Sequence, residues 1–322
     1  MAQKSSVILP EGSQLAGIKT RGVLALLLIS MRPHQWLKNL FVLTPLLFGK
    51  KLIDPGAIGQ ALLACASFCL LSSAIYICND ILDAPEDRAH PEKRLRPISS
   101  GALPVWAALL GSVGILSAAF WLGASLGLQF LLVAMIYLGL MAGYCLALKR
   151  AIVLDAMVIA SGFVLRVVGG ALAVEVNPTH WLIVCAFLLA LYLAFAKRRQ
   201  ELLMLSDSAI QHRHVLDSYT VGYLDQVNNI LIGATVVCYA LYTVAPETVA
   251  RFGTDSLIYG TVFVIYGLLR YMALIQDPTK GGEPGKLLMS DKPLLIAILG
   301  WIAYNALVIY RPFIAVIEEY AR

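Results

Sequence analysis

The feature that most constrains this chain is a succession of long apolar runs. Most runs are close to the roughly 20 residues that an α-helix needs to cross the hydrocarbon core of a bilayer. Helices on the surface of soluble proteins keep a polar face, and these runs do not. They occupy residues 33–49, 57–82, 104–122, 126–148, 152–174, 180–197, 222–245, 256–274 and 293–310. The runs predict an all-α polytopic membrane protein with about nine transmembrane helices.

Composition supports this class. The chain is 59% hydrophobic and 14% charged, whereas soluble domains are about 45–50% apolar and about 25% charged. This excludes a cytosolic enzyme, a disordered protein and a disulfide-stapled secreted domain. The net charge of +5 does not indicate nucleic-acid binding, because membrane topology and anionic ligands explain basic loop residues first. We therefore expect the membrane and anionic small molecules as partners, and no nucleic acid.

The loops between the runs predict the domain organisation and the topology. We expect an N-terminal tail with an interfacial lead-in over 1–30, a single transmembrane catalytic domain over 31–311, and a C-terminal tail over 312–322. Long charged loops alternate with short ones, and most of the 25 Lys and Arg residues fall on the long-loop side. Basic residues accumulate on the cytoplasmic side of the inner membrane. We therefore expect the N-terminus inside, the C-terminus outside and an active site that faces the cytoplasm.

The sharpest chemical signal lies where the second run ends. Asp80, Asp83 and Asp87 are spaced i, i+3, i+7, so a helix would place them on one face. Three carboxylates near a low-dielectric boundary repel one another unless a multivalent cation lies among them. Ligands that are all oxygen favour Mg²⁺, which commonly binds one or two carboxylates together with substrate phosphates. We predict that these three residues bind Mg²⁺ for a phosphate-bearing substrate; the alternative is a solvated helix end with chance acids.

A basic segment follows the three acids. Its basic residues, Arg88, Lys93, Arg94 and Arg96, are typical of a diphosphate clamp, because guanidinium groups suit phosphate oxygens. The alternative is that these basic residues only keep this loop on the cytoplasmic side of the membrane. Other candidates for substrate binding lie at cytoplasmic helix ends: Lys38, Asn39, Asn79, Tyr144, Arg150, Lys197, Arg198 and Glu201.

Two charged residues lie inside apolar runs. Asp155 needs a partner there, and we favour Lys149 or Mg²⁺. Arg166 lies about three helical turns deeper and is a functional candidate by default; the structural alternative is pairing with a buried carbonyl or acid. Gly170, nearby, is expected to allow close helix packing. His212 and His214 are expected to be solvated, and the segment 281–286 lacks the spacing of a P-loop.

These motifs resemble the UbiA-type membrane prenyltransferase superfamily. The pattern Asn79-Asp80-x-x-Asp83-x-x-x-Asp87 is similar to its first Asp-rich motif, and nine helices in a UbiA-like bundle fit its fold. The superfamily usually carries a second acidic motif, D-x-x-x-D. The corresponding stretch here offers Lys149, Arg150 and a single Asp155.

Without the second acidic motif, the sequence resembles one branch of the superfamily, the decaprenyl-phosphate phosphoribosyltransferases. The shared segments include Arg32–Asn39, Asp87–Gly101, Leu148–Arg150, Gly162–Val167, Lys197–Leu202 and Gly282–Pro284. The resemblance implies transfer of 5-phosphoribose from phosphoribosyl diphosphate to a polyprenyl phosphate, for lipid-linked arabinose and cell-wall arabinan synthesis. It implies catalytic roles for Asp80, Asp83, Asp87, Lys149 and Asp155.

There are two alternatives to this function, one within the same superfamily and one from another class of protein. One is an aromatic prenyltransferase that uses a prenyl diphosphate, and the missing second acidic motif argues against it. The other is a non-enzymatic transporter of lipids or anions, and the position of the acids at one membrane face argues against that. Formation of a homo-oligomer is left open at this stage.

Overall fold

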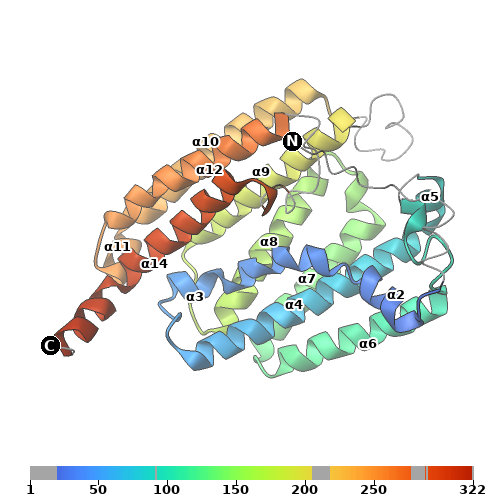
Figure 1. Cartoon of the computed structure of the whole chain (residues 1–322), viewed down its shortest axis with the longest axis horizontal. Helices are drawn as coiled ribbons and strands as arrows, with labels where there is room; N and C mark the ends of the chain where they lie inside the picture. Colours follow the sequence, from blue (N-terminus) through green and yellow to red (C-terminus); the bar gives the residue numbers. More distant parts are fainter. Residues whose placement is uncertain (1–19, 91–92, 205–217, 277–286, 288, 321–322) are drawn as a thin grey trace, which may run out of the picture. The chain divides into compact units, whose positions relative to one another are not determined.

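The computed structural model describes residues 20–90, 93–204, 218–276, 287 and 289–320 (Figure 1). Within these ranges the chain forms α-helices and 3-10 helices, with no β-strand. Eight helices are long and apolar enough to cross a membrane. The all-α class expected from the apolar runs is therefore confirmed.

The helices of spanning length follow the predicted runs. They are α4 (Pro55–Leu82), α6 (Val105–Ala124), α7 (Leu128–Leu146), α8 (Leu154–Ala173), α9 (His180–Met204), α10 (Val221–Val244), α12 (Thr261–Gln276) and α14 (Lys292–Tyr320). The 3-10 helix η6 (Ser256–Gly260) extends α12 at its start. The shorter elements are α2 (Val23–Ser30), η1 (Pro33–Leu43), α3 (Thr44–Phe48), α5 (Ala84–Ala89), η2 (Lys93–Leu95), η3 (Leu148–Arg150) and α11 (Pro246–Phe252).

The first predicted run, 33–49, differs from the others. It is helical but consists of η1 followed by α3, and it is not among the eight spans. Pro45 lies in the first turn of α3, where its missing N–H costs no helical hydrogen bond. The run also carries buried polar residues, Gln35 and Asn39. Nine helical segments therefore follow the nine runs within the described ranges, and eight of them have spanning length.

The tryptophans of α6 support insertion in a membrane. Trp106 and Trp121 lie near the two ends of this helix and are 66% and 77% exposed. At 1.5 Å per residue they are separated by about 22 Å along the axis. Tryptophan concentrates at the two interfaces of a bilayer. The exposed apolar surface between them is therefore suited to contact with lipid.

The chain divides into two compact units, which we describe separately. Unit 1 comprises residues 1–36 and 67–121, and unit 2 comprises residues 37–66 and 122–322. In unit 1, α2, the later part of α4, α5 and α6 share one core. Its buried side chains include Leu26, Ile77, Ile98 and Leu103. This core holds the end of α4, where the aspartate motif lies.

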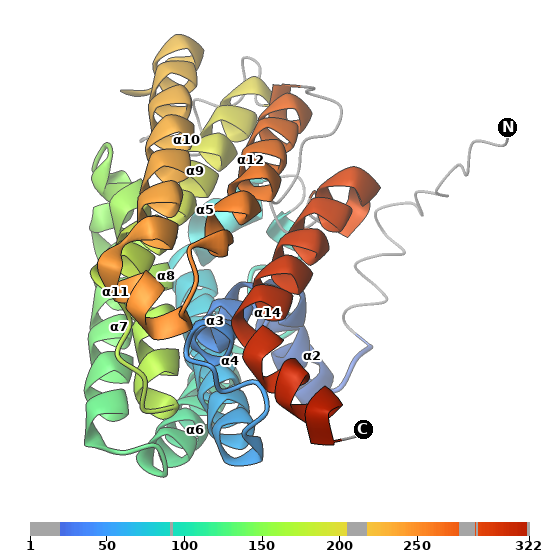
Figure 2. The ribbon, with the colours of Figure 1, turned by 90° about the vertical axis from the view of Figure 1, so that its left-hand side faces the viewer.

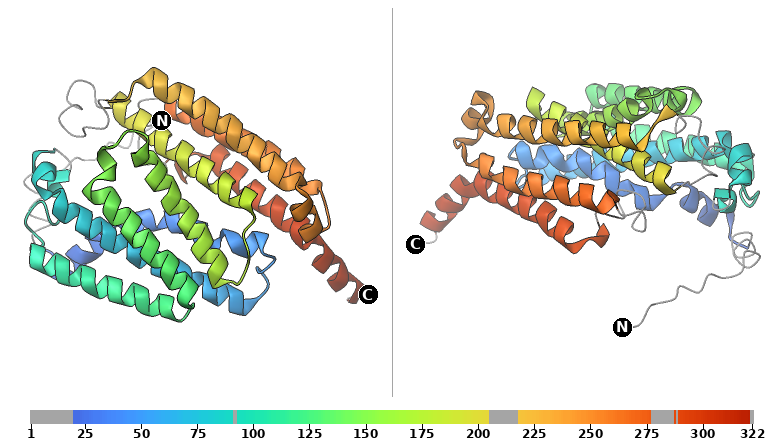
Figure 3. Two further views of the ribbon diagram at one scale, coloured as in Figure 1. Left: turned by 180° about the vertical axis from the view of Figure 1, so that it is seen from behind. Right: turned by 90° about the horizontal axis from the view of Figure 1, so that it is seen from above.

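Unit 2 contains most of the spanning helices. α7, α8, α9 and α10 each pack against the next, and α12 packs against α10 and α14 (Figures 2 and 3). The main core lies among α9, α10 and α12, with Phe195, Leu224 and Ile275 fully or almost fully buried. This packing fixes the polar end of α9, which carries Lys197–Glu201.

Gly170 brings α8 close to η1. A Cβ atom built at this position would collide with the backbone carbonyl of Val42. The expectation that this glycine allows close packing is confirmed.

Gly170→Ala should therefore destabilise the protein by about 1–3 kcal/mol, because one extra carbon must displace backbone. Unfolding in mixed detergent micelles, followed by circular dichroism, measures the loss. Gly139→Ala on α7 is the matched control, since a Cβ there meets nothing within 4 Å. Equal stability of the two variants would contradict the close approach of α8 and η1.

Candidate active site

The aspartate motif of unit 1 lies on a nearly continuous helical path. α4 ends at Leu82 and α5 begins at Ala84. The backbone N–H groups of Asp83 and Asp87 nevertheless donate to the carbonyls of Asn79 and Asp83, at 2.8 Å each. The helical bonding therefore continues through the junction, which favours one shared face for residues seven apart.

Two of the three aspartates share one arginine. Arg96 Nη1 donates to Asp80 Oδ1 at 3.0 Å and to Asp87 Oδ2 at 2.5 Å. Arg32 Nη2 donates to Asp80 Oδ1 at 2.5 Å. Asp80 and Asp87 are 1% and 3% exposed. Two guanidinium groups thus balance two buried carboxylates, as buried charges require.

Arg32 is a member of this cluster that the sequence-based list of candidates lacks. It lies just before η1, with a positive φ of 54°. Its guanidinium carbon lies 5.2 Å from the ring centroid of Tyr76, within the range of a cation–π interaction. The contact with Asp80 joins residues 48 positions apart, so sequence spacing carries no signal for it.

Asp83 differs from its two neighbours in the motif. It is half-buried, and its Oδ2 accepts a hydrogen bond of 2.8 Å from Asn79 Nδ2. Within the described ranges, no three His, Cys, Asp or Glu side chains are gathered closely enough to hold a metal ion. The available donors, carboxylate and amide oxygens, are nevertheless of the kind that Mg²⁺ prefers. The Mg²⁺ site therefore fits the donor chemistry and stays a prediction.

The other basic candidates of unit 1 lie between α5 and α6. Arg88 is exposed, and its Nε donates to the carbonyl of Ser99 at 3.3 Å. Lys93 begins η2 and is half-buried. Its backbone N–H donates to His90 Nδ1 at 3.3 Å. These contacts fix the loop that also carries Arg96.

Unit 2 holds a second buried ionic cluster, centred on Arg198 of α9. This side chain is 1% exposed. Its Nε donates to Asp155 Oδ2 at 2.7 Å and its Nη1 to Glu201 Oε2 at 2.8 Å. Its Nη2 lies 3.5 Å from the hydroxyl of Tyr144. Each nitrogen of Arg198 is therefore engaged with the protein. The expected pairing of Lys149 with Asp155 is corrected, because packing of α8 against α9 supplies Arg198 instead. A metal ion at Asp155 stays a prediction.

Tyr219 completes this cluster. Its hydroxyl donates to Asp155 Oδ1 at 3.0 Å and accepts the backbone N–H of Val153 at 2.7 Å. Val153 has a φ of 67°, which a β-branched residue rarely adopts. Burial raises the pKa of Tyr219 to about 12, so its hydroxyl keeps its proton and can donate. Tyr219 lies 64 residues from Asp155, and the sequence alone did not identify it.

Tyr219→Phe should lower the unfolding free energy by about 1–3 kcal/mol, because two buried groups lose a partner. The pH dependence of unfolding in micelles checks the cause. An ordinary tyrosine has a pKa near 10, so the raised value stabilises the folded state below pH about 10, and this stabilisation is lost as the pH rises towards 12. The difference in unfolding free energy between wild type and Tyr219→Phe should therefore decrease over this range. A difference that does not change with pH would contradict the role of the Tyr219 hydroxyl as a hydrogen-bond donor to Asp155.

Arg166 of α8 forms a third buried group, in unit 2. It is 5% exposed, and its Nε donates to Asn39 Oδ1 at 2.6 Å. Its Nη1 donates to the carbonyl of Gly162 at 2.9 Å and its Nη2 to the hydroxyl of Tyr137 at 2.8 Å. Its guanidinium carbon lies 4.8 Å from the Tyr137 ring centroid. These partners tie η1 and α7 to α8, and they are carbonyl, amide and phenol groups rather than acids.

The remaining candidates of unit 2 are more accessible. Lys197 Nζ lies 3.7 Å from Glu201 Oε1. Lys149 is half-buried and Arg150 is exposed, both on η3. Lys38 is half-buried on η1. His212, His214 and the segment 281–286 lie outside the described residues.

With this geometry in place, comparison with known proteins decides the family. Residues 40–290 match the model of the UbiA prenyltransferase family. The chain belongs to this family. Together with the eight apolar helices, membership in the UbiA family shows an integral membrane protein.

Two curated UbiA-family relatives are similar over most of their length. A decaprenyl-phosphate phosphoribosyltransferase from Mycolicibacterium smegmatis is 33% identical over 298 residues, which are 88% of this chain and 92% of the relative. A protein of the same name from Corynebacterium glutamicum is 33% identical over 288 residues, 87% of this chain and 86% of the relative.

A solved UbiA homolog from Archaeoglobus fulgidus, bound to GPP and Mg²⁺, has a TM-score of 0.69 to this chain at 20% identity. The match covers 88% of this chain and 99% of that one. At this identity the likeness shows the fold. The UbiA-like architecture expected from the motif is therefore confirmed.

Within this UbiA-family chain, the two ionic clusters differ in what they can do. In unit 1, Arg32 and Arg96 are partly exposed, at 22% and 26% of their side chains, so they can exchange a carboxylate for a phosphate oxygen. In unit 2, Arg198 is fully enclosed by its partners. The first cluster suits ligand binding, and the second suits positioning of α8 against α9.

Proposed function

We propose that this protein transfers 5-phosphoribose from phosphoribosyl diphosphate to a polyprenyl phosphate, such as decaprenyl phosphate, and releases diphosphate. The observation that carries the proposal is the 33% identity, over 88% of the chain, to a protein named decaprenyl-phosphate phosphoribosyltransferase. In this proposal the product supplies lipid-linked arabinose for cell-wall arabinan. The enzyme is then a Mg²⁺-dependent glycosyltransferase of the membrane.

The reaction replaces one C–O bond by another. The bond between ribose C1 and the diphosphate breaks, and its electron pair leaves with the diphosphate. An oxygen of the lipid phosphate forms the new bond to C1, with inversion of the anomeric carbon. The lipid phosphate is already ionised near neutral pH, so no strong general base is needed. The protein's main task is to hold positive charge where the leaving group develops negative charge.

In unit 1 we assign the diphosphate site. Asp80, Asp83 and Asp87 would hold Mg²⁺, which when bound neutralises charge on the diphosphate. Arg32 and Arg96, now paired with Asp80 and Asp87, would donate to diphosphate oxygens. This exchange leaves the carboxylates free to bind a cation. Asn79 would orient Asp83, and Arg88 and Lys93 would add positive charge to the same loop.

In unit 2 we assign the cations for the other two phosphates. Lys38, Lys149, Arg150 and Lys197 are accessible enough to meet the C5 phosphate and the lipid phosphate. Asp155, Tyr144 and Glu201 would hold Arg198 in place, and Arg166 would hold Asn39. These residues then act as positioning residues.

The expected environment is the cytoplasmic membrane. Most Lys and Arg residues fall in the loops on the side of the N-terminus, which supports an N-terminus inside, a C-terminus outside and an active site facing the cytoplasm. Phosphoribosyl diphosphate, a water-soluble donor, would enter from that side.

Transfer of label tests the proposal. Purified protein is incubated with polyprenyl phosphate, Mg²⁺ and phosphoribosyl diphosphate labelled at C1, and the lipid is extracted. We expect label in the lipid phase, and none when a chelator removes Mg²⁺. An unlabelled lipid phase, together with turnover of a prenyl diphosphate and an aromatic acid, would overturn the proposal in favour of an aromatic prenyltransferase.

A further inference from the structure

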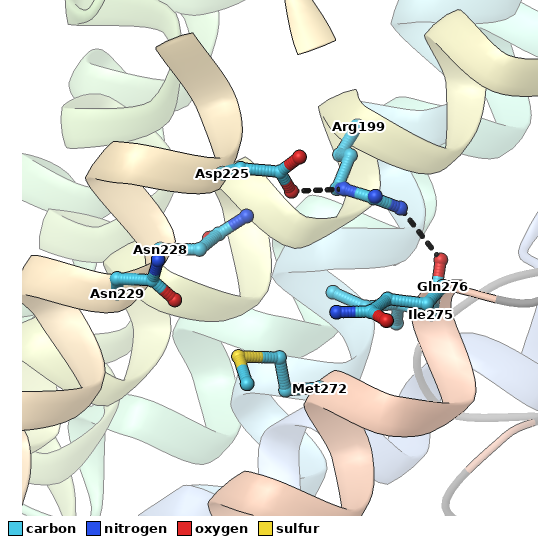
Figure 4. A pocket seen from close by; sticks show the side chains of 7 residues that line it. All are labelled: Arg199, Asp225, Asn228, Asn229, Met272, Ile275 and Gln276. Carbon is cyan, nitrogen blue, oxygen red and sulfur yellow. Dashed lines mark hydrogen bonds and ion pairs between the residues drawn. The ribbon is translucent and has the colours of Figure 1, made fainter. Parts of the chain in front are cut away.

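A polar pocket lies among α9, α10 and α12 of unit 2 (Figure 4). Its volume is ≈ 240 Å³, and its lining comprises Arg199, Asp225, Asn228, Asn229, Met272, Ile275 and Gln276. Arg198 and Arg199 are neighbours in sequence but bond in different directions. Arg198 bonds to Tyr144 and Asp155, on α7 and α8, whereas Arg199 bonds to residues of α10 and α12. The pocket is therefore distinct from the Arg198 cluster.

The charges in this pocket cancel. Arg199 Nε donates to Asp225 Oδ1 at 2.5 Å, and Arg199 Nη1 donates to the carbonyl of Ile275 at 3.0 Å (Figure 4). An anionic ligand would meet the carboxylate of Asp225, and a cationic ligand would meet Arg199. The ion pair therefore favours an uncharged occupant.

Asn228 provides the second observation. It is 2% exposed, and neither its Oδ1 nor its Nδ2 has a hydrogen-bond partner in the described structure. A buried amide without partners costs free energy, so it calls for an explanation, and a water or ligand bound beside it supplies one. An amide offers one acceptor and one donor group side by side. Adjacent hydroxyls, each able to donate and accept, satisfy both at once.

We propose that this pocket binds a small uncharged molecule with adjacent hydroxyl groups, about the size of one sugar ring. The amides of Asn228, Asn229 and Gln276 would meet its hydroxyls, and Met272 would cover its apolar C–H face. Pockets for drug-sized ligands begin near about 300 Å³, so ≈ 240 Å³ is too small for a prenyl chain. The inference stands on this pocket alone and does not depend on the proposed phosphoribosyl transfer.

The substitution Asn228→Leu distinguishes between two roles of the Asn228 amide, ligand binding and stabilisation of the fold. Leucine removes two unpartnered polar atoms at similar volume, so the unfolding midpoint should stay the same or rise. A structural amide would instead lower it on removal. Gln226→Leu is the matched control, because Gln226 is an exposed amide of the same helix outside the pocket lining.

Saturation-transfer NMR on the full chain in micelles tests binding, with D-ribose as the probe. We expect transfer to ribose from wild type and from Gln226→Leu, and an affinity at least about tenfold weaker for Asn228→Leu, as loss of about 1.4 kcal/mol would give. Cyclopentanol, which lacks adjacent hydroxyls, should bind more weakly than ribose. Unchanged ribose binding in Asn228→Leu would overturn the proposal. So would equal binding of cyclopentanol, or no transfer to any probe, which would mean a pocket holding water only.

Discussion

Asp83→Asn should reduce phosphoribosyl transfer at least about 100-fold, because losing one group that stabilises developing charge costs about 2.7–4 kcal/mol of barrier. The substitution removes a carboxylate charge and keeps the side-chain volume. Asp83 is half-buried, and its Oδ2 accepts a hydrogen bond from Asn79 Nδ2, which an asparagine side-chain oxygen can also accept. The bundle should therefore remain folded, as judged by circular dichroism. Binding of Mn²⁺, used as a paramagnetic substitute for Mg²⁺, should weaken in parallel.

Glu86→Gln is the matched control for Asp83→Asn. Glu86 is an exposed acid of α5, three residues from Asp83, and its removal changes the net charge by the same amount. We expect Glu86→Gln to keep both activity and Mn²⁺ affinity. Equal losses in the two variants would indicate a general charge effect, and full activity of Asp83→Asn would refute the metal assignment.

Asp155→Asn should lower the unfolding free energy by about 3–5 kcal/mol. It removes the charge that faces Arg198 at 2.7 Å, in a pair whose side chains are 2% and 0% exposed. Arg198 keeps Glu201 and Tyr144 but loses its fully buried acid partner. Loss of a buried charge partner is costly, whereas an apolar pair of similar volume often restores stability. The double variant Asp155→Leu with Arg198→Met should therefore lose less than the sum of the single substitutions.

Unfolding by sodium dodecyl sulfate in mixed micelles measures these differences. Asp54→Asn is the control: Asp54 pairs with Lys51 at 3.4 Å with both side chains more than a third exposed. Its Oδ1 accepts from the N–H groups of Gly56 and Ala57 at the start of α4, and asparagine can also accept these bonds. We expect the unfolding midpoint of Asp54→Asn to equal that of wild type. A near-normal stability of Asp155→Asn would contradict a tightly coupled Arg198 cluster.

The fold was largely predictable from the sequence, because apolar runs of spanning length admit few other structures. The main difference, in 33–49, arises where Pro45 and buried polar residues interrupt an apolar run. The Asp-rich motif was also predictable, since Asp80 and Asp87 are close in sequence and the helix continues between them.

The ion-pair partners were less predictable. Arg32 and Tyr219 lie 48 and 64 residues from the aspartates that they contact, so only tertiary packing brings them together. The sequence indicated that Asp155 needs a partner and favoured Lys149 or Mg²⁺, but helix packing supplies Arg198. The pocket beside Arg199 was not predicted, because Asn228 and Gln276 belong to no sequence motif. They line one pocket only because α10 and α12 pack near each other.

The central claim is that the intact 5-phosphoribosyl group moves to the lipid phosphate. The most direct measurement uses phosphoribosyl diphosphate that carries a carbon label in the ribose and a phosphorus label in the 5-phosphate. Wild-type protein should place both labels in the extracted lipid in the ratio of the donor, with release of unlabelled diphosphate, and Asp83→Asn should place neither there. Lipid that carries one label without the other, or no label while the donor is consumed, would contradict the account.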